Sequence, residues 1–166
     1  MVTLDVDGLT FSFPEGWKAS KYDEWNFYRN QFSKQFSGIK AVDILALDDG
    51  KKAFFIEVKD YRHPDTEKPS NLPKAIADKV LMTLAALLPA KLNANEVNEM
   101  EMAVSLLNSK KLHVVAHIEQ NRAHQPIIDP ADLKMKLAQL LRAVDRHPKV
   151  VSTRSMQNLN WNVNQN

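Results

Sequence analysis

The 166-residue sequence has no cysteine, which excludes a disulfide framework, a thiol nucleophile and a cysteine-ligated metal site. Glycine is scarce, with 4 residues, and no glycine-rich loop of the kind that binds phosphates is present, so a P-loop enzyme is not indicated. The sequence also lacks an apolar stretch of membrane-spanning length and a signal-peptide pattern. We therefore expect a soluble cytoplasmic protein that does not associate with membranes.

An excess of charge of one sign is missing as well. The 22 Lys and Arg residues are nearly balanced by 20 Asp and Glu residues, and the net charge of +2 does not by itself indicate nucleic-acid binding. The length and the 44% hydrophobic content are those of one domain with its own core. We expect a single domain over residues 1–155, followed at 156–166 by a C-terminal edge strand or a flexible tail.

The N-terminal residues predict a β-hairpin. Apolar residues alternate with polar ones on both sides of Asp7-Gly8, a dipeptide that favours a two-residue turn. Such a turn pairs Val6 with Leu9, Leu4 with Phe11 and Val2 with Phe13, so that all six side chains share one face. This apolar face is expected to pack against the hydrophobic core.

The rest of the chain predicts helices and strands of a mixed α/β fold. An aromatic stripe at helical spacing indicates one amphipathic helix over residues 22–36. Residues 41–47 and 53–59 are apolar on both faces, as in central strands covered by helices. Further elements are expected as a helix at 73–88 that Pro89 ends, a helix at 96–107, a strand at 112–118 and a helix from residue 129.

Three charged residues lie inside the two apolar strands. Asp43 is in the first strand, and Glu57 and Lys59 share one face of the second. A three-residue turn at 48–50 with Gly50 left-handed would set Asp43 opposite Phe55 and on the face of Glu57. Because isolated charges are costly in a core, these residues call for a partner or a metal ion.

The chemistry of this triad favours phosphodiester hydrolysis. Mg²⁺ is bound by one or two carboxylates and keeps several waters for contacts with phosphates. A lysine beside that ion would orient or deprotonate the attacking water and stabilise charge on the phosphoryl oxygens. The expected cofactor is Mg²⁺, or Mn²⁺ in its place.

Asp43 followed by Glu57-Val58-Lys59 on the next strand, with a helix before and a helix and strand after, resembles the PD-(D/E)XK nuclease superfamily. The resemblance implies a restriction-endonuclease-like core, a mixed central sheet flanked by helices. It also implies a metal held by Asp43, Glu57 and the main-chain carbonyl of Val58. Val42 stands where the family name has proline, and the 73–88 helix lacks the Gln-x-x-x-Tyr of the DNA-repair branch.

Other residues are candidates for supporting roles. Many members of the superfamily add an acidic residue from the preceding helix, and Glu24 is the candidate because helical geometry turns Asp23 further away. Arg62, in a basic loop, and Lys79, in the later helix, are candidates for contacts with nucleic-acid phosphates. His113 and His117 are about 13 Å apart on an extended strand, too far for one zinc ion, and predict a partly exposed strand face.

The sequence thus predicts a Mg²⁺-dependent nuclease that acts on DNA or RNA. A second possibility is a catalytically inactive module that keeps the fold for binding or regulation. Such a module could pair with a partner protein or form a homodimer through the strand that contains Leu159, Trp161 and Val163. A third is an unrelated α/β scaffold, in which Asp43 and Glu57 would lie on opposite faces.

Overall fold

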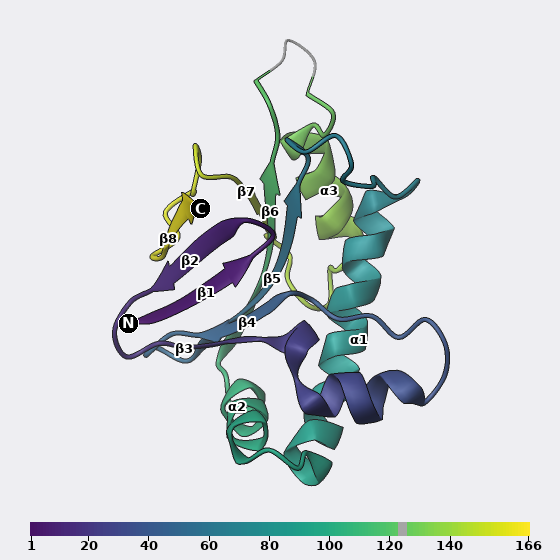
Figure 1. Ribbon diagram of the computed structural model, residues 1–166, viewed down its shortest axis with the longest axis vertical. Helices are drawn as coiled ribbons and strands as arrows, with labels where there is room; N and C mark the ends of the chain where they lie inside the picture. The colour runs from purple at the N-terminus through teal and green to yellow at the C-terminus, as the bar shows by residue number, and fades with distance from the viewer. Residues whose placement is uncertain (123–125) are drawn as a thin grey trace.

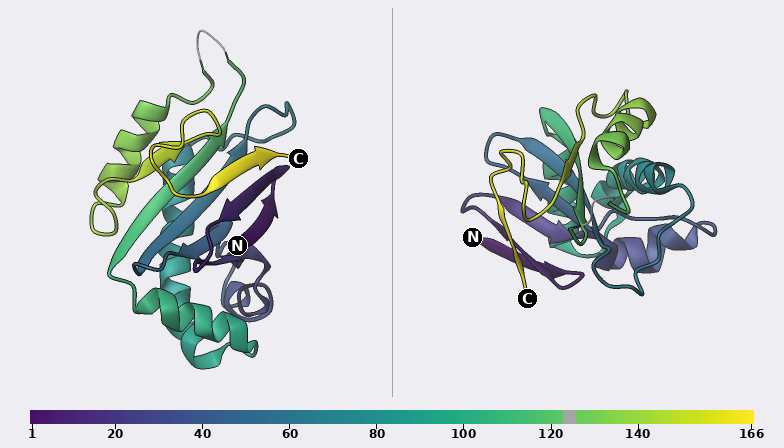
Figure 2. Two further views of the ribbon diagram at one scale, coloured as in Figure 1. Left: turned by 90° about the vertical axis from the view of Figure 1, so that its left-hand side faces the viewer. Right: turned by 90° about the horizontal axis from the view of Figure 1, so that it is seen from above.

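The computed structural model describes residues 1–122 and 126–166, which form a mixed α/β fold with two sheets. The larger sheet has the strand order β3-β4-β5-β6-β7 and is mixed, because β4 is antiparallel to β3 and β5 whereas β5, β6 and β7 are parallel. Its strands are β3 (Lys18–Lys21), β4 (Ile44–Leu47), β5 (Lys52–Asp60), β6 (Lys111–Glu119) and β7 (Lys149–Val151). Helices cover one face of this sheet, and the smaller sheet lies on the other (Figures 1 and 2).

The smaller sheet has the order β1-β2-β8 and contains the predicted hairpin. β1 (Val2–Val6) and β2 (Leu9–Phe13) pair in the expected register, with Val6 opposite Leu9. Asp7 and Gly8 make the turn with φ of 49° and 75°, the left-handed conformations that a tight hairpin requires. β8 (Asn162–Gln165) adds to the other side of β2.

The C-terminal segment packs its apolar side chains inside its own chain. Trp161 is buried against Phe13, Trp17 and Phe54 between the two sheets. Leu159 and Val163 are partly buried against the same cluster. These side chains therefore already pack against other residues of the same chain. The fold gives no support to a homodimer that forms through them.

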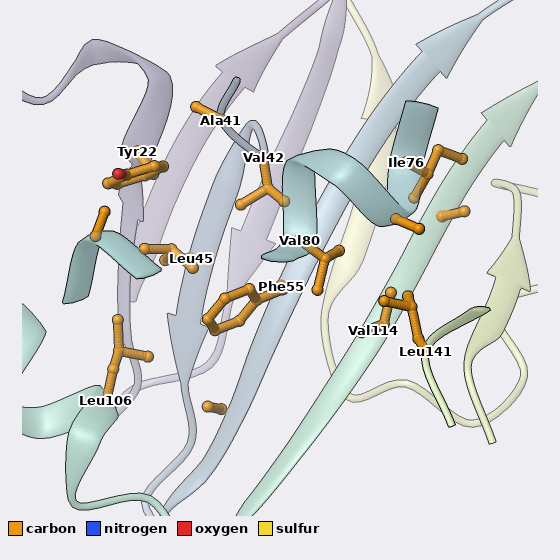
Figure 3. Packing of buried hydrophobic residues seen from close by; sticks show 14 of the residues in the cluster. Tyr22, Ala41, Val42, Leu45, Phe55, Ile76, Val80, Leu106, Val114 and Leu141 are labelled. Atoms are coloured by element: carbon orange, nitrogen blue, oxygen red, sulfur yellow. The ribbon is translucent and has the colours of Figure 1, made fainter. Parts of the chain in front are cut away.

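Strand β5 separates two hydrophobic cores, in agreement with its apolar character on both faces. Phe55 faces the helices, where it packs with residues such as Val80 and Val114 (Figure 3). Phe54 and Ile56 face the smaller sheet. Full burial of each such side chain contributes about 1.5–3 kcal/mol. β5 is consequently held from both sides, and a side chain placed on it has little freedom to move.

Three α-helices flank the sheet where the sequence predicts helices. They are α1 (Leu72–Asn93), α2 (Val97–Leu107) and α3 (Pro130–Leu140). Asn71 caps α1 by accepting a hydrogen bond from the Lys74 N–H at 3.1 Å. The prediction that Pro89 ends α1 is wrong, because the helix continues to Asn93 with Ala86, Leu87 and Ala90 buried. This burial offsets the backbone hydrogen bond that proline cannot donate.

The single helix predicted over residues 22–36 is also wrong. The segment forms a 3₁₀ turn η1 (Tyr22–Glu24), a π-helical turn η2 (Phe27–Gln31) and a second 3₁₀ turn η3 (Phe32–Lys34). The buried carboxylate of Glu99 in α2 accepts the N–H groups of Asn26 and Phe27 at 2.7 and 3.0 Å. A distant side chain thus starts a new helical turn at this point, and local spacing contains no sign of it.

Among residues 1–122 and 126–166, no helix combines the length and the apolarity that crossing a bilayer requires.

Replacing Glu99 with alanine is expected to lower the free energy of unfolding by about 2–4 kcal/mol, because two largely buried N–H groups lose a charged acceptor. Urea unfolding measures the change. Glu101→Ala, at an exposed position of the same helix, serves as the control and is expected to change stability by no more than about 0.5 kcal/mol. Equal effects of the two substitutions would contradict the capping role of Glu99.

Candidate active site

The register between β4 and β5 brings the two predicted carboxylates together. Leu47 pairs with Ala53 and Ile44 with Ile56, so continuing the ladder by one residue sets Asp43 opposite Glu57. The predicted pairing of Asp43 with Phe55 is wrong by two residues. The turn is built with Lys51 in the left-handed conformation, at φ 61°, and not with Gly50. The observed register differs from the predicted one by two residues, and side chains alternate with a period of two, so Asp43 and Glu57 still share one face. The unrelated-scaffold alternative predicts that they lie on opposite faces.

Glu57 is the more deeply buried of the two carboxylates. Its side chain is 0% exposed on the helix-covered face of β5. Oε1 is 3.1 Å from the Lys59 ammonium and 2.5 Å from the Lys79 ammonium, which extends from α1. Oε2 is buried and has no hydrogen-bond partner among the described residues. Burial and the neighbouring charge of Asp43 outweigh both lysines and raise the pKa of Glu57 to about 7.

Asp43 is held against β5 by a backbone contact. Its Oδ2 accepts the Val58 N–H at 2.7 Å. Burial raises the pKa of Asp43, although Lys79, the Val58 N–H and Lys59 act in the opposite direction. Val58 thus fixes the position of the Asp43 carboxylate through its N–H, a contact that the sequence does not reveal. The role predicted for its carbonyl stays a prediction.

Helix α1 is anchored beside Asp43 by Thr83, which lies one turn after Lys79. The Val42 N–H donates to Thr83 Oγ1 at 3.1 Å, and the Thr83 hydroxyl donates to the Lys79 carbonyl oxygen at 2.7 Å. Thr83 is fully buried. This chain of hydrogen bonds connects the segment before β4 to the turn of α1 that contains Lys79, so it fixes the ammonium close to both carboxylates.

Lys79 was predicted as a phosphate contact, and the structure gives it the additional role of an ion-pair partner of Glu57. Lys59, as predicted, lies beside Glu57. Burial acts to lower the pKa of Lys59, but the charge of Glu57 and the contact with it outweigh burial, and the pKa is raised. Lys59 is therefore a protonated cation at neutral pH.

The acidic residue of the preceding segment that reaches the site is Asp23 and not Glu24. Glu24 is exposed and forms an ion pair with Lys21 at 2.7 Å, which holds the pKa of Glu24 below its ordinary value. Burial, followed by the charge of Asp43, raises the pKa of Asp23. The expectation that Asp23 points away assumed an α-helix, whereas these residues form a 3₁₀ turn with about three residues per turn.

Arg62 follows the end of β5 and pairs with Asp60, which lies on the strand face opposite to that of Glu57. Its guanidinium donates to both carboxylate oxygens of Asp60, at 2.8 and 2.6 Å. The bidentate contact and the accompanying N–H bond hold the pKa of Asp60 below its ordinary value. The structure therefore does not bring Arg62 together with the carboxylates as a phosphate contact.

The two histidines of β6 differ in their surroundings, and the predicted exposed face is wrong for one of them. His117 is 0% exposed, and its Nε2 is 2.9 Å from Glu119 Oε1. Burial acts to raise the pKa of Glu119, but hydrogen bonds from His117 and the Thr153 N–H lower it below its ordinary value. His113 is half-buried and stacks on Phe54. The smaller sheet, which covers this face, explains the burial of His117.

A pocket of about 240 Å³ opens beside Glu57. Three lysines line it, together with two glutamates and apolar residues of α1. The lysines are Lys40, Lys59 and Lys79. No cluster of three or more His, Asp or Glu side chains suited to a metal ion occurs within residues 1–122 and 126–166. A metal ion here would therefore rely on two carboxylates, main-chain oxygen and water.

Comparisons with known proteins yield one partial likeness. No protein-family model matches the chain, and no solved structure matches it. The chain is 32% identical, over 149 residues, to a cysteine–tRNA ligase of Neisseria meningitidis serogroup A, and the match covers 72% of this chain and 21% of the ligase. The chain thus spans about a fifth of that relative, and the similarity concerns a segment of the ligase.

Lys79→Met is expected to raise the pKa of Glu57 further above about 7, because one of the two ammonium groups that stabilise its charge is lost. A raised carboxyl pKa means that the folded protein binds more protons than the unfolded chain, so stability falls as pH rises through this range. The loss of stability is accordingly expected to be about 2 kcal/mol at pH 8 and smaller at pH 6. Urea unfolding at both pH values, without divalent ions, measures it.

Lys74→Met is the matched control for this substitution. Lys74 lies on the same helix and pairs with Asp78 at 2.5 Å, but its side chain is 62% exposed. Its loss is expected to change stability by less than about 0.5 kcal/mol at either pH. A Lys79→Met effect that is equal at pH 6 and pH 8 would show that the lysine does not stabilise the Glu57 charge.

Proposed function

We propose that the chain is a Mg²⁺-dependent phosphodiester hydrolase of the PD-(D/E)XK type, acting on DNA or RNA. The observation that carries this proposal is the placement of Asp43, just before β4, beside Glu57 of β5, with Lys59 on the same face next to Glu57. A pocket lined by lysines opens at this point. Three residues that the superfamily resemblance singles out are therefore neighbours in space, and two of them, Glu57 and Lys59, line the pocket.

The topology supports a restriction-endonuclease-like core. The antiparallel β4-β5 pair carries the acidic residues, and the chain then passes through α1 and α2 before β6 joins β5 in parallel. Helices pack on the face of the sheet where Glu57 lies (Figure 1). This order of a strand pair, helices and a parallel strand is what the resemblance implies.

The residues present fit a hard divalent cation. Burial and the charge of Asp43 raise the pKa of Glu57, and Glu57 Oε2 is buried without a partner among the described residues. Two carboxylates suffice for Mg²⁺, which keeps waters in its remaining positions. Asp43 and Glu57, with main-chain oxygen at Val58, would hold the ion. When bound, Mg²⁺ would act as a Lewis acid toward the phosphoryl group.

The lysines near Glu57 supply the positive charge of the proposed site. Lys59 lies 3.1 Å from Glu57 Oε1, where its ammonium would orient the attacking water and stabilise negative charge on the phosphoryl oxygens. Lys40 and Lys79 line the same pocket and provide positive charge for the phosphates of a nucleic-acid strand. Asp23 adds negative charge close to Asp43 and is the candidate for a third acidic residue.

One observation favours the alternative of an inactive module. Lys79 and Lys59 both contact Glu57 Oε1, so the buried carboxylate has partners of opposite charge without a metal ion. In this alternative the chain keeps the fold and these ion pairs, and it binds or regulates a partner without catalysing a reaction. Metal binding distinguishes this alternative from the proposed hydrolase.

The substrate class is open to a direct test. The likeness to a segment of a cysteine–tRNA ligase makes tRNA one substrate to include, beside single- and double-stranded DNA and other RNA. This chain spans 21% of the ligase, so no aminoacylation activity is proposed.

The decisive experiment measures Mn²⁺ binding by calorimetry in the wild type, Asp43→Asn and Glu57→Gln, and follows cleavage of these nucleic acids in the same samples. Both substitutions are expected to weaken Mn²⁺ binding at least tenfold and to lower the cleavage rate by about 10²–10⁴-fold. Asp132→Asn removes a surface carboxylate paired with Lys136 and is expected to change neither.

The outcomes separate the alternatives. Binding and cleavage lost together in both variants support a metallonuclease. Wild-type protein that folds but binds no Mn²⁺ contradicts the hydrolase and favours the inactive module. Mn²⁺ binding that persists in both variants would place the metal ion elsewhere and remove the basis of the proposal.

A further inference from the structure

A second, strongly basic pocket lies at the opposite end of β5 and on its other face. It measures about 270 Å³, and we call it the lysine pocket. Its polar lining includes Lys52, Lys111, Lys149, Asp48, Asn158 and Asn160. None of these residues belongs to the site around Glu57.

The sheet topology gathers the three lysines. Lys52, Lys111 and Lys149 are the first residues of β5, β6 and β7, which are neighbouring parallel strands. Lys52 pairs directly with Lys111, and Lys149 pairs with Val115 on the next strand. Alternation along the strands turns all three side chains to the face of Phe54 and Val115, which is the face of the smaller sheet.

The pocket has a rigid aromatic floor. Phe54 is 6% exposed and stacks on Trp17 with ring centroids 5.2 Å apart and on His113 with centroids 5.3 Å apart. Burial lowers the pKa of His113, and although Asp145 opposes this, charges from all three lysines lower it further. The His113 ring is therefore neutral at neutral pH and lies within the field of all three ammonium groups.

The positive charge of the lysine pocket is only partly neutralised. Its lining contains three lysines and one aspartate. Asp48 is 3.7 Å from the Lys52 ammonium, and its other oxygen accepts the Lys52 N–H. The nearby carboxylate of Asp145 is occupied by the N–H groups of Val114 and His147. The pocket thus retains an excess of positive charge inside a concave surface, which attracts anions.

The wall formed by the C-terminal segment is conformationally strained. Gln157 and Asn158 both adopt left-handed backbone conformations, with φ of 49° and 61°. Lys149 donates to the Gln157 carbonyl oxygen at 2.8 Å, and the Gln157 amide donates to the Val150 carbonyl oxygen at 2.8 Å. Strained non-glycine residues that neighbours hold in place occur preferentially at binding sites. This wall contributes Asn158 and Asn160, whose amides are donors for anionic oxygens.

We propose that the lysine pocket binds a phosphate group, carried either by a free nucleotide or by the backbone of a nucleic-acid strand. Ammonium groups and side-chain amides are donors that recognise phosphate oxygens, and the volume accommodates a phosphate with an attached sugar. The Glu57 site is five residues further along β5, about 16 Å away, on the opposite face. The lysine pocket is therefore a separate anchoring site, and the proposal does not depend on hydrolysis at Glu57.

Binding is measured in EDTA at low salt with four probes, namely inorganic phosphate, adenosine monophosphate, and 12-nucleotide single strands of DNA and of RNA. The test variant is Lys111→Gln combined with Lys149→Gln. The control, Lys91→Gln combined with Lys134→Gln, removes the same charge from exposed positions on α1 and α3. The pocket variant is expected to lose at least tenfold in affinity and the control less than about twofold.

The His113 ring gives an independent reading of where the anion binds. Its NMR signals, identified with His113→Gln, are expected to shift on titration with each probe that binds, and this shift is expected to be absent in the pocket variant. Thermal unfolding of each variant confirms that it is folded. Because Lys149 also contacts Gln157, Lys111→Gln alone is measured as well, with an expected loss of at least threefold.

The probes distinguish the two sources of phosphate. Tight binding of adenosine monophosphate that competes with the strands supports a nucleotide site. Pocket-dependent binding of the strands alone supports a backbone contact. Equal affinity losses in the pocket and control variants, or probes that leave the His113 signals unmoved, would overturn the proposal.

Discussion

The burial of one carboxylate in the central strand governs the arrangement around it. Glu57 is fully enclosed between the sheet and α1, and a charge in such a position is stable only with close partners of opposite charge. Lys59 supplies one ammonium group from the same strand, and Lys79 supplies the other from the helix. The ion pairs therefore set the orientation of α1 relative to the sheet, and the Thr83 hydrogen bonds reinforce that orientation.

Each face of β5 carries one of the two proposed sites. The helix-covered face carries Glu57 and opens to the pocket for which hydrolysis is proposed. The other face packs against the smaller sheet and ends at the lysine pocket. A rigid strand between two cores keeps both sites at a fixed separation.

The sequence predicts those features that depend on neighbouring residues. Alternation about Asp7-Gly8 determines the hairpin register, and the apolar residues of β4 and β5 identify the central strands. The shared face of Asp43 and Glu57 also follows, because a shift of two residues in the turn does not change which side the residues face. Each of these predictions uses only contacts between residues that are close in the chain.

Features that depend on distant contacts were not predicted. Glu99 interrupts the helical segment 73 residues earlier in the chain, which local spacing does not encode. The contact of Lys79 with Glu57 depends on how α1 packs on the sheet. Asp23 replaces Glu24 because a 3₁₀ turn rotates side chains differently from an α-helix. Strands β3 and β7 are short, and each pairs with a strand that is distant in the sequence, β4 and β6 respectively.

The central claim is that Asp43 and Glu57 form a cation site for which Lys79 competes. The most direct measurement is a crystal structure of the protein soaked in Mn²⁺, with the metal located by its anomalous scattering. We expect an anomalous peak between the Asp43 and Glu57 carboxylates and a Lys79 ammonium that has moved away from Glu57 Oε1. A well-ordered site with no peak, and with Lys79 still bound to Glu57, would contradict the claim.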